Sequence, residues 1–157
     1  MPNILAHVLM GEATAGLLSF SAAKTAEKHR NTFHLGAQGP DVLFYSNPWP
    51  WAKDRRVSAL GGEMHTRETG CIFREMLLFA SDPAWAKEER DRLAAYLMGY
   101  VCHYYLDSIA HPYIHSLVGF DPLHDNRTLS SKYEHSWVEA KIDTVMVARI
   151  KGRKAAS

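Results

Sequence analysis

The chain has 157 residues, the length of one ordinary domain. Apolar residues make up 46% and charged residues 22%, which excludes a disordered chain, a collagen-like repeat or a low-complexity array. Eighteen basic and seventeen acidic side chains leave a formal net charge of +1, so the basic excess typical of duplex nucleic-acid binders is missing. The nine histidines are unusually numerous, and histidine is the commonest metal ligand.

The ends of the chain and its two cysteines favour a cytoplasmic protein. Residues 1–7 have no basic segment followed by a long apolar run, so we expect no signal peptide. No stretch approaches about 18 uninterrupted apolar residues, which argues against a transmembrane segment. Cys71 and Cys102 fall in helical patterns and are predicted to be reduced and buried. We expect one domain over residues 1–150 and a frayed basic tail at 151–157.

In the first half of the chain, apolar residues recur at helical spacing in two segments. The first helix is predicted from residue 3 to about residue 20, with Asn3 as its N-cap. Residues 32–50 contain three prolines and two glycines, so we expect an irregular segment with at most a short helical turn over 41–45. A second long helix is predicted over residues 63–80.

The second half predicts two more helices. Residues 85–110 are apolar around nearly the whole helical circumference, so this third helix should be central. Pro112 should end or kink it, because proline disfavours helical geometry at the preceding residue. Residues 115–130 are predicted to form a loop, and Ser130 or Ser131 should cap a fourth helix. Since no segment alternates with a period of two, we predict an all-α, single-domain helical bundle.

Three ionisable residues lie four positions apart in the third helix: His103, Asp107 and His111. Each step of four residues turns only about 40° around an α-helix, so all three side chains project from one face. Burying them without partners in an apolar helix would cost free energy, and a bound cation removes that cost. Two imidazoles and a carboxylate suit zinc. His115 continues the series beyond Pro112.

Further candidate ligands lie on other segments. His135 and Glu139 have the same spacing in the fourth helix, and such pairs facing across a bundle build dinuclear metal sites. His7 lies in the first helix and His65 in the second. Asp41 follows Gly-Pro in the irregular segment, where a tight turn can direct its carboxylate inward.

A structural interpretation competes with the metal site. A single histidine on a helix is more often hydrogen-bonded in the core or at the surface, and a His–Glu pair four residues apart also stabilises a helix. The joint pattern favours a metal centre. The remaining histidines, His29, His34 and His124, lack such partners and are interpreted as solvated or loop residues.

The order of these motifs resembles the zinc-dependent phospholipase C family. The chain has His7, then LGAQGPD at 35–41, His65, GYVCHYYLD at 99–107, HPYIH at 111–115 and the HxxxE motif at 135–139. The resemblance extends from residue 3 to about residue 146. It implies an all-α bundle, similar in fold to the single-strand-specific zinc nucleases, with a trinuclear zinc cluster at the base of a cleft.

The resemblance also implies a set of ligands for two or three zinc ions. One ion would be held by four residues: Asp41, His65, His103 and Asp107. A further ion would be held by His7, Asp107 and the free amino terminus, which removal of Met1 would leave on Pro2.

The remaining ion would be held by His135 and Glu139 together with one histidine of the HPYIH motif. In the secreted members of the family that histidine lies at an intermediate spacing. Helix geometry favours His111, whereas the place after the proline favours His115, and we favour His111 narrowly.

The activity implied by the resemblance is phosphodiester hydrolysis of the phospholipase C type by a metal-activated water, with Asp41 as a ligand and general base. Three arginines are candidates for clamping a phosphate oxygen: Arg55, Arg56 and Arg67. Four aromatic residues near Asp41 could line an acyl-chain wall or stack on a base, although capping the core is the simpler interpretation: Phe44, Tyr45, Trp49 and Trp51.

Other functions fit parts of the pattern. A single-strand nuclease or nucleotidase would use the same metals, but the lack of a basic stripe favours small or lipid phosphoesters. His124-Asp125 is an HD dipeptide, yet it lies in the predicted loop, which argues against an HD-type phosphohydrolase. A non-enzymatic, metal-stabilised helical module is the third alternative. Structural zinc sites are usually rich in cysteine, so ligands rich in histidine and carboxylate favour catalysis.

Overall fold

The structure is a computed structural model that describes residues 4–47, 49, 51, 53–119 and 129–152. These residues form helices and no strand, which confirms the predicted all-α class. In chain order the elements are α1 (Ile4–Ala15), α2 (Phe20–Lys28), α3 (Arg30–Ala37), the 3₁₀ helix η1 (Gly39–Tyr45), α4 (Arg56–Thr66), α5 (Thr69–Ala80), α6 (Lys87–Leu117) and α7 (Leu129–Lys151).

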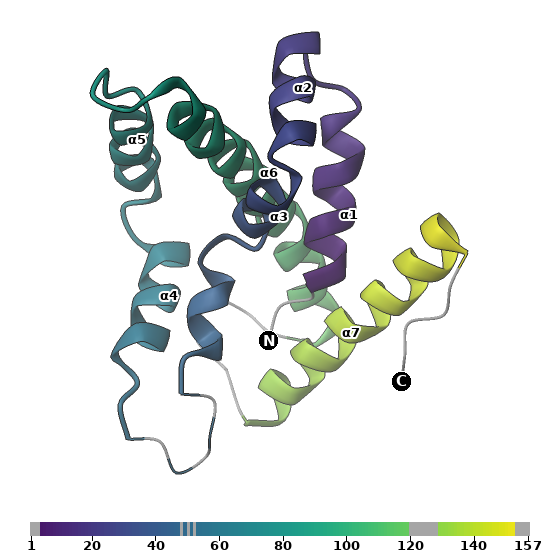
Figure 1. The fold of residues 1–157 in the computed structure, drawn as a ribbon. Coiled ribbons are helices and arrows are strands. Elements are labelled where there is room, and N and C mark those ends of the chain that lie inside the picture. The colour runs from purple at the N-terminus through teal and green to yellow at the C-terminus, as the bar shows by residue number, and fades with distance from the viewer. Residues whose placement is uncertain (1–3, 48, 50, 52, 120–128, 153–157) are drawn as a thin grey trace.

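Helix α6 is the central element, as its all-round apolar pattern predicted. It contacts α1, α2, α3, α5, α7 and η1, and these elements surround it in Figure 1. A small core of Ala26, Phe33, Ala95 and Cys102 lies where α2 and α3 pack on α6. Helix α1, from the start of the described chain, and helix α7, from its end, thus both pack against α6.

Two glycines let α3 and α6 cross at backbone contact. A Cβ at Gly36 would lie 2.0 Å from the carbonyl oxygen of Tyr96, and one at Gly99 would lie 2.1 Å from that of Phe33. Side chains larger than hydrogen do not fit at such distances. The crossing fixes the end of α3, and with it the start of η1, against the face of α6 that carries His103.

Several predicted boundaries of the first helices were wrong. Helix α3 includes residues 32–37, which were predicted to be irregular, although the predicted short turn over 41–45 does form as part of η1. The first predicted helix ends at Ala15, and α2 follows it. The second predicted helix is divided into α4 and α5, because Glu68 adopts the left-handed conformation at φ 50° and interrupts helical hydrogen bonding.

The prediction of an end or a kink near His111 was wrong as to the end, since α6 continues through Pro112 to Leu117. Proline cannot donate a hydrogen bond to the carbonyl of Ser108, but both residues are exposed, so water can satisfy that carbonyl. Residues 115–117 are thus helical rather than loop. Helix α7 begins at Leu129, so the two serines predicted as caps lie inside it.

The cysteine prediction was half right. Both cysteines are free, and Cys102 is buried in the core, but Cys71 is exposed on α5. Helix α5 has no buried residue along its length, so its apolar pattern overstated its burial. None of the described helices has the length and apolar character needed to cross a membrane. Residues 120–128, with His124, and most of the predicted tail, 153–157, lie outside the described residues.

Candidate metal centre

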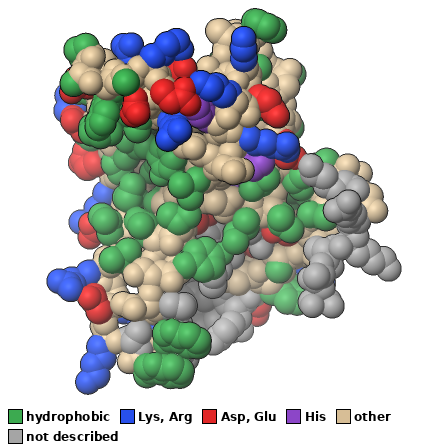
Figure 2. Space-filling view, viewed as in Figure 1, with side chains coloured by type: hydrophobic (Ala, Val, Ile, Leu, Met, Phe, Trp, Pro, Cys, Tyr) green, Lys and Arg blue, Asp and Glu red, His purple; other side chains and the backbone are tan. Residues whose placement is uncertain are grey.

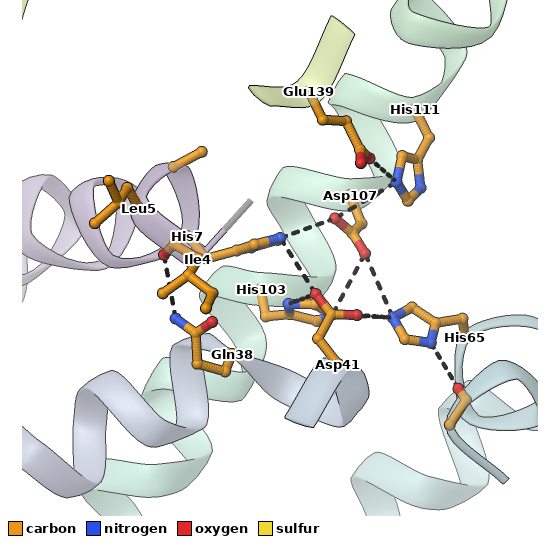
Figure 3. A network of polar contacts seen from close by, with 12 residues as sticks. Ile4, Leu5, His7, Gln38, Asp41, His65, His103, Asp107, His111 and Glu139 are labelled. Atoms are coloured by element: carbon orange, nitrogen blue, oxygen red, sulfur yellow. Dashed lines mark hydrogen bonds and ion pairs between the residues drawn. The ribbon is translucent and has the colours of Figure 1, made fainter. Parts of the chain in front are cut away.

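The nine predicted ligands gather around the C-terminal half of α6. Five elements supply them: His7 from α1, Asp41 from η1, His65 from α4, His103, Asp107, His111 and His115 from α6, and His135 and Glu139 from α7. Figure 3 shows seven of these side chains pointing toward one another from separate helices. Residues separated by more than 130 positions in the sequence therefore share one polar cluster.

Asp107 lies in the middle of this cluster. Its Oδ1 is 3.4 Å from His7 Nε2 and 4.0 Å from His111 Nε2. Its Oδ2 is 3.3 Å from His103 Nε2 and 3.7 Å from His65 Nε2. One carboxylate thus faces four imidazoles, a position from which it can bridge neighbouring cations (Figure 3).

The first group of metal-compatible atoms comes from Asp41, His65 and His103. His65 Nε2 is 3.0 Å from Asp41 Oδ1 and 3.3 Å from His103 Nε2. His65 Nδ1 lies 2.7 Å from the carbonyl oxygen of Gly61, which can only accept, so Nδ1 carries the proton. The lone pair on His65 Nε2 is then available to a cation, and the second ring nitrogen has the carbonyl partner common in metal sites.

The second group comes from His111, His135 and Glu139. Glu139 Oε1 is 2.9 Å from His135 Nε2 and 3.5 Å from His111 Nε2. His115 lies one turn beyond His111, with the two rings stacked at 5.7 Å, and its ring centroid is 5.2 Å from that of His135. The continuous helix through Pro112 thus places His111 against the glutamate, with His115 one turn further along.

The third group comes from His7, His103 and Asp107. The rings of His7 and His103 lie 4.3 Å apart, and His7 Nε2 is 3.7 Å from Asp41 Oδ2. The amino terminus, which the family resemblance adds to this group, falls in residues 1–3, outside the described part of the chain.

Asp143 positions His7, although it was not among the predicted site residues. Its carboxylate, on α7, accepts hydrogen bonds from the backbone N–H of Leu5 at 3.2 Å and of Ala6 at 2.7 Å. These are free donors at the start of α1, so Asp143 acts as an N-cap supplied by another helix. Its position four residues after Glu139, on the same face of α7, was the available signal.

The motif Gly36-x-x-Gly39-Pro40-Asp41 has a structural reason in this chain. Gly39 has φ +55°, and a Cβ there would lie 2.3 Å from His103 Cδ2. Glycine is therefore required both by its left-handed conformation and by the adjacent imidazole. Pro40 lies in the first turn of η1, and this tight 3₁₀ turn directs the buried carboxylate of Asp41 into the cluster.

Burial determines the protonation of the innermost groups. It lowers the pKa of His103 to about 2 and lowers that of His7, so both imidazoles are neutral. Burial also raises the pKa of Asp107 to about 6. Asp41 Oδ2 and Asp107 Oδ2 are buried and receive no hydrogen bond from the described residues. Neutral imidazoles beside such carboxylate oxygens fit a divalent cation, which would satisfy both.

The second group differs because its members form ion pairs. Burial would raise the pKa of Glu139, but contacts with His111 and His135 hold it at about 2. The contact with Glu139 in turn raises the pKa of His111. In the first group, burial opposes protonation of His65, but the hydrogen bond with Asp41 outweighs this effect and raises the pKa of His65. A cation that binds His65 or His111 must therefore compete with protons for these imidazoles.

A cleft of about 260 Å³ opens onto the cluster. It is lined by Pro40, Met64, His65, Tyr100, His103, Tyr104, Asp107, Ser108 and His111. This volume lies below the roughly 300–1,000 Å³ of pockets that enclose drug-sized ligands, so it suits a phosphoryl group rather than a whole lipid. Burial raises the pKa of Tyr100 to about 12, which keeps its hydroxyl neutral in the cleft wall.

Other predicted residues lie elsewhere. The expectation that His29 is solvated was wrong, because it is buried with Nε2 3.7 Å from Glu88 Oε1. The same expectation was wrong for His34, which is half-buried on α3 with Nε2 3.7 Å from Glu12 Oε1. None of the three candidate arginines lines the cleft. Arg55 bonds to backbone carbonyls and Arg56 pairs with Asp54, so neither is placed to clamp a phosphate there.

The four aromatic residues near Asp41 do not behave alike. Phe44 stacks on the imidazole of His65 at 5.6 Å and 20° between ring planes. Tyr45, Trp49 and Trp51 are exposed, so the interpretation that these residues cap the bundle core was wrong for them. Phe44 thus fixes the ring of a candidate ligand, while the tryptophans lie outside the packed bundle.

The fold and the cluster together define a helical bundle with a histidine–carboxylate metal centre. The chain belongs to the zinc-dependent phospholipase C family, whose sequence model matches residues 6–157. The match includes every predicted ligand except the amino terminus. No curated protein and no solved structure matches the chain.

Proposed function

We propose that the protein is a zinc-dependent phosphoesterase that hydrolyses phosphodiesters in the manner of a phospholipase C. The main support is the meeting of three histidine–carboxylate groups around Asp107, at the base of a cleft that fits a phosphoryl group. Membership of the zinc-dependent phospholipase C family supports the same activity. We also propose that the protein is cytoplasmic and that residues 1–150 form one domain.

Two or three zinc ions would be shared among these groups. The first would take Asp41, His65, His103 and Asp107, and the second would take His111, His135 and Glu139. His7 and Asp107 would provide two ligands of a third. The chemistry supplied by bound zinc is Lewis-acid polarisation of a phosphoryl oxygen and a lowered pKa for a water molecule.

The residues of the chain would then orient the reactants and move a proton. Asp41 would accept the proton of the attacking water through whichever carboxylate oxygen does not bind zinc; its Oδ1 lies 3.0 Å from His65 Nε2, and its buried Oδ2 receives no hydrogen bond from the described residues. The neutral side chains of Tyr100, Tyr104 and Met64 line the cleft and limit the access of other water molecules. The low exposure of the cluster strengthens electrostatic interactions with the phosphoryl group.

A phospholipid or small phosphodiester is the proposed substrate class. A single-strand nuclease or nucleotidase would use the same metal chemistry, but the net charge is only +1 and the candidate arginines do not line the cleft. A side-by-side assay of phosphatidylcholine and single-stranded DNA distinguishes the two activities. Faster hydrolysis of DNA would replace the lipid assignment and keep the metal chemistry.

The direct test combines metal analysis of the purified protein with turnover of bis-p-nitrophenyl phosphate, with and without chelator. We expect zinc-dependent turnover in the wild type and a loss of about a hundredfold or more in D41N. E75Q is the matched control, since it makes the same chemical change at an exposed glutamate on α5 paired with Arg74. Two or more bound zinc ions with no turnover of any phosphoester would retain the metal centre and reject the enzyme.

A further inference from the structure

Two exposed tryptophans stack on each other at one end of the molecule. Trp49 and Trp51 lie in the loop between η1 and α4, with ring centroids 5.4 Å apart and planes at 11°. They are 59% and 74% exposed, although each is among the largest apolar side chains in the protein. Hydrophobic side chains gather at the lower end of Figure 2, over this loop, which is lowest in Figure 1. Such exposure costs free energy unless the surface meets a partner.

Hydrogen bonds connect the described residues at the two ends of this loop. Arg55 Nη1 donates to the carbonyl of Asn47 and Nη2 to the carbonyl of Trp49, each at 3.1 Å. Asn47 adopts φ 50°, a left-handed conformation that asparagine tolerates, and its amide faces the carbonyl of Asp54 at 3.5 Å. These contacts connect Asn47 and Trp49 to the residues just before α4.

The loop joins two elements that carry candidate metal ligands. The two elements it joins each supply a ligand, Asp41 from η1 and His65 from α4, and η1 packs against α4. Phe44 links the two regions by stacking on His65. Exposed apolar side chains flank the loop on both elements: Tyr45 on η1, Val57 and Leu60 on α4.

We propose that the Trp49–Trp51 loop docks the protein on the surface of a phospholipid bilayer. Tryptophan is enriched at membrane–water interfaces because its ring is apolar and its indole N–H is polar. The docking surface consists of Trp49, Trp51 and the flanking Tyr45, Val57 and Leu60. This assignment rests on the proposed function in one respect, namely that the substrate is a lipid.

Charge and volume support a bilayer as the partner. Residues 53–56 carry three basic side chains and one acidic, and this positive excess attracts an anionic bilayer surface at a distance, without a direct phosphate contact. The cleft, at about 260 Å³, fits a phosphoryl group and is small for a whole phospholipid. A lipid substrate would therefore keep its chains in the bilayer while its head group enters the cleft.

Single-stranded nucleic acid fits the loop less well. The two indoles already cover one face of each other, which leaves fewer faces for bases. The guanidinium of Arg56 is held by both carboxylate oxygens of Asp54, and that of Arg55 is held by backbone carbonyls. Neither arginine is available for the phosphate contacts on which nucleic-acid affinity depends.

The test is cosedimentation of the full-length protein with phosphatidylcholine vesicles, with and without phosphatidylserine. We expect wild type to bind both and to prefer the anionic vesicles, and W49A/W51A to bind about tenfold to a hundredfold more weakly. F20A is the matched control, because Phe20 is an equally exposed aromatic residue on α2, toward the other end of the molecule. W49F/W51F keeps two apolar rings and should retain most of the binding, which separates docking from misfolding.

Equal vesicle binding by wild type and W49A/W51A would overturn the proposal, as would a change in tryptophan emission on adding oligo(dT) with no shift of the emission to shorter wavelength on adding vesicles. Activity is measured separately on vesicles and on a soluble diester. The ratio of vesicle to soluble turnover should fall in W49A/W51A and stay constant in F20A. Vesicle binding without turnover of either substrate would reject the proposed function and still support docking by this loop.

Discussion

Gly39 lies directly against the ring of His103, so close that a Cβ on Gly39 would be 2.3 Å from Cδ2 of the imidazole. The contact joins the turn that carries Asp41 to the helix that carries Asp107. Because Gly39 has no side chain, η1 can pack this closely on α6, and the packing fixes the distance between Asp41 and Asp107.

The first prediction follows from this contact. G39A should destabilise the fold by about 1–3 kcal/mol, because it places alanine at φ +55° and drives a methyl group into His103. It should also reduce the amount of zinc bound per chain. The measurements are urea unfolding and metal analysis of the purified variant. G62A is the control, since a Cβ at Gly62 meets nothing within 4 Å, and it should be neutral or slightly stabilising.

The second prediction concerns the crossing of α3 and α6. G99A should cost about 3 kcal/mol or more, because its Cβ would lie 2.1 Å from the carbonyl oxygen of Phe33 and 2.6 Å from the backbone nitrogen of Ala37. Neither backbone atom can move without separating the helices. Thermal unfolding measures the effect, and G70A, in open space on α5, is the matched substitution. A G99A protein as stable as G70A would contradict the described crossing.

The third prediction tests the cap that Asp143 places on α1. D143A should lose about 1–2 kcal/mol of stability, since two backbone donors at the start of α1 lose their acceptor. His7 lies within the first turn of that helix, so zinc affinity should fall as well. T144A, a neighbouring exposed substitution on α7, should change stability by less than about 0.5 kcal/mol. Unchanged zinc binding in D143A would show that the cap on α1 does not position His7 for the metal centre.

The fourth prediction concerns pH. Contacts with carboxylates raise the pKa of His111 and of His65, and burial raises that of Asp107 to about 6, so these three groups hold protons as the pH falls. Zinc requires their deprotonated forms, so binding should release protons and weaken as pH falls from about 7.5 to about 5.5. Calorimetric titration in two buffers with different ionisation enthalpies measures both effects. H34N, outside the cluster, should leave the proton release unchanged; equal affinity at both pH values would contradict the assigned ligands.

The sequence predicted those parts of the site that depend on local periodicity. His103, Asp107 and His111 share a face because one continuous helix carries them, and His135 and Glu139 lie one turn apart for the same reason. The order of the motifs then predicted the family to which the chain belongs. Helical spacing is a local property, so it can be read before the tertiary structure is known.

The remaining features depend on tertiary contacts. The path of α6 through Pro112 is possible because the residues that lose a hydrogen bond face water, which periodicity does not report. The break between α4 and α5 depends on a single left-handed residue, Glu68. Asp143 gained its role only when α7 packed beside the start of α1. Each of these features depends on the tertiary environment of a residue, which the sequence pattern does not report.

The central claim is that distant side chains share metal ions at one centre. Anomalous diffraction from crystals of the zinc-loaded protein, collected at the zinc absorption edge, tests it most directly. We predict at least two zinc peaks beside Asp107, one of them bonded to His65 and His103 and another to His135 and Glu139. Zinc found elsewhere, with those imidazoles binding no ion, would contradict it.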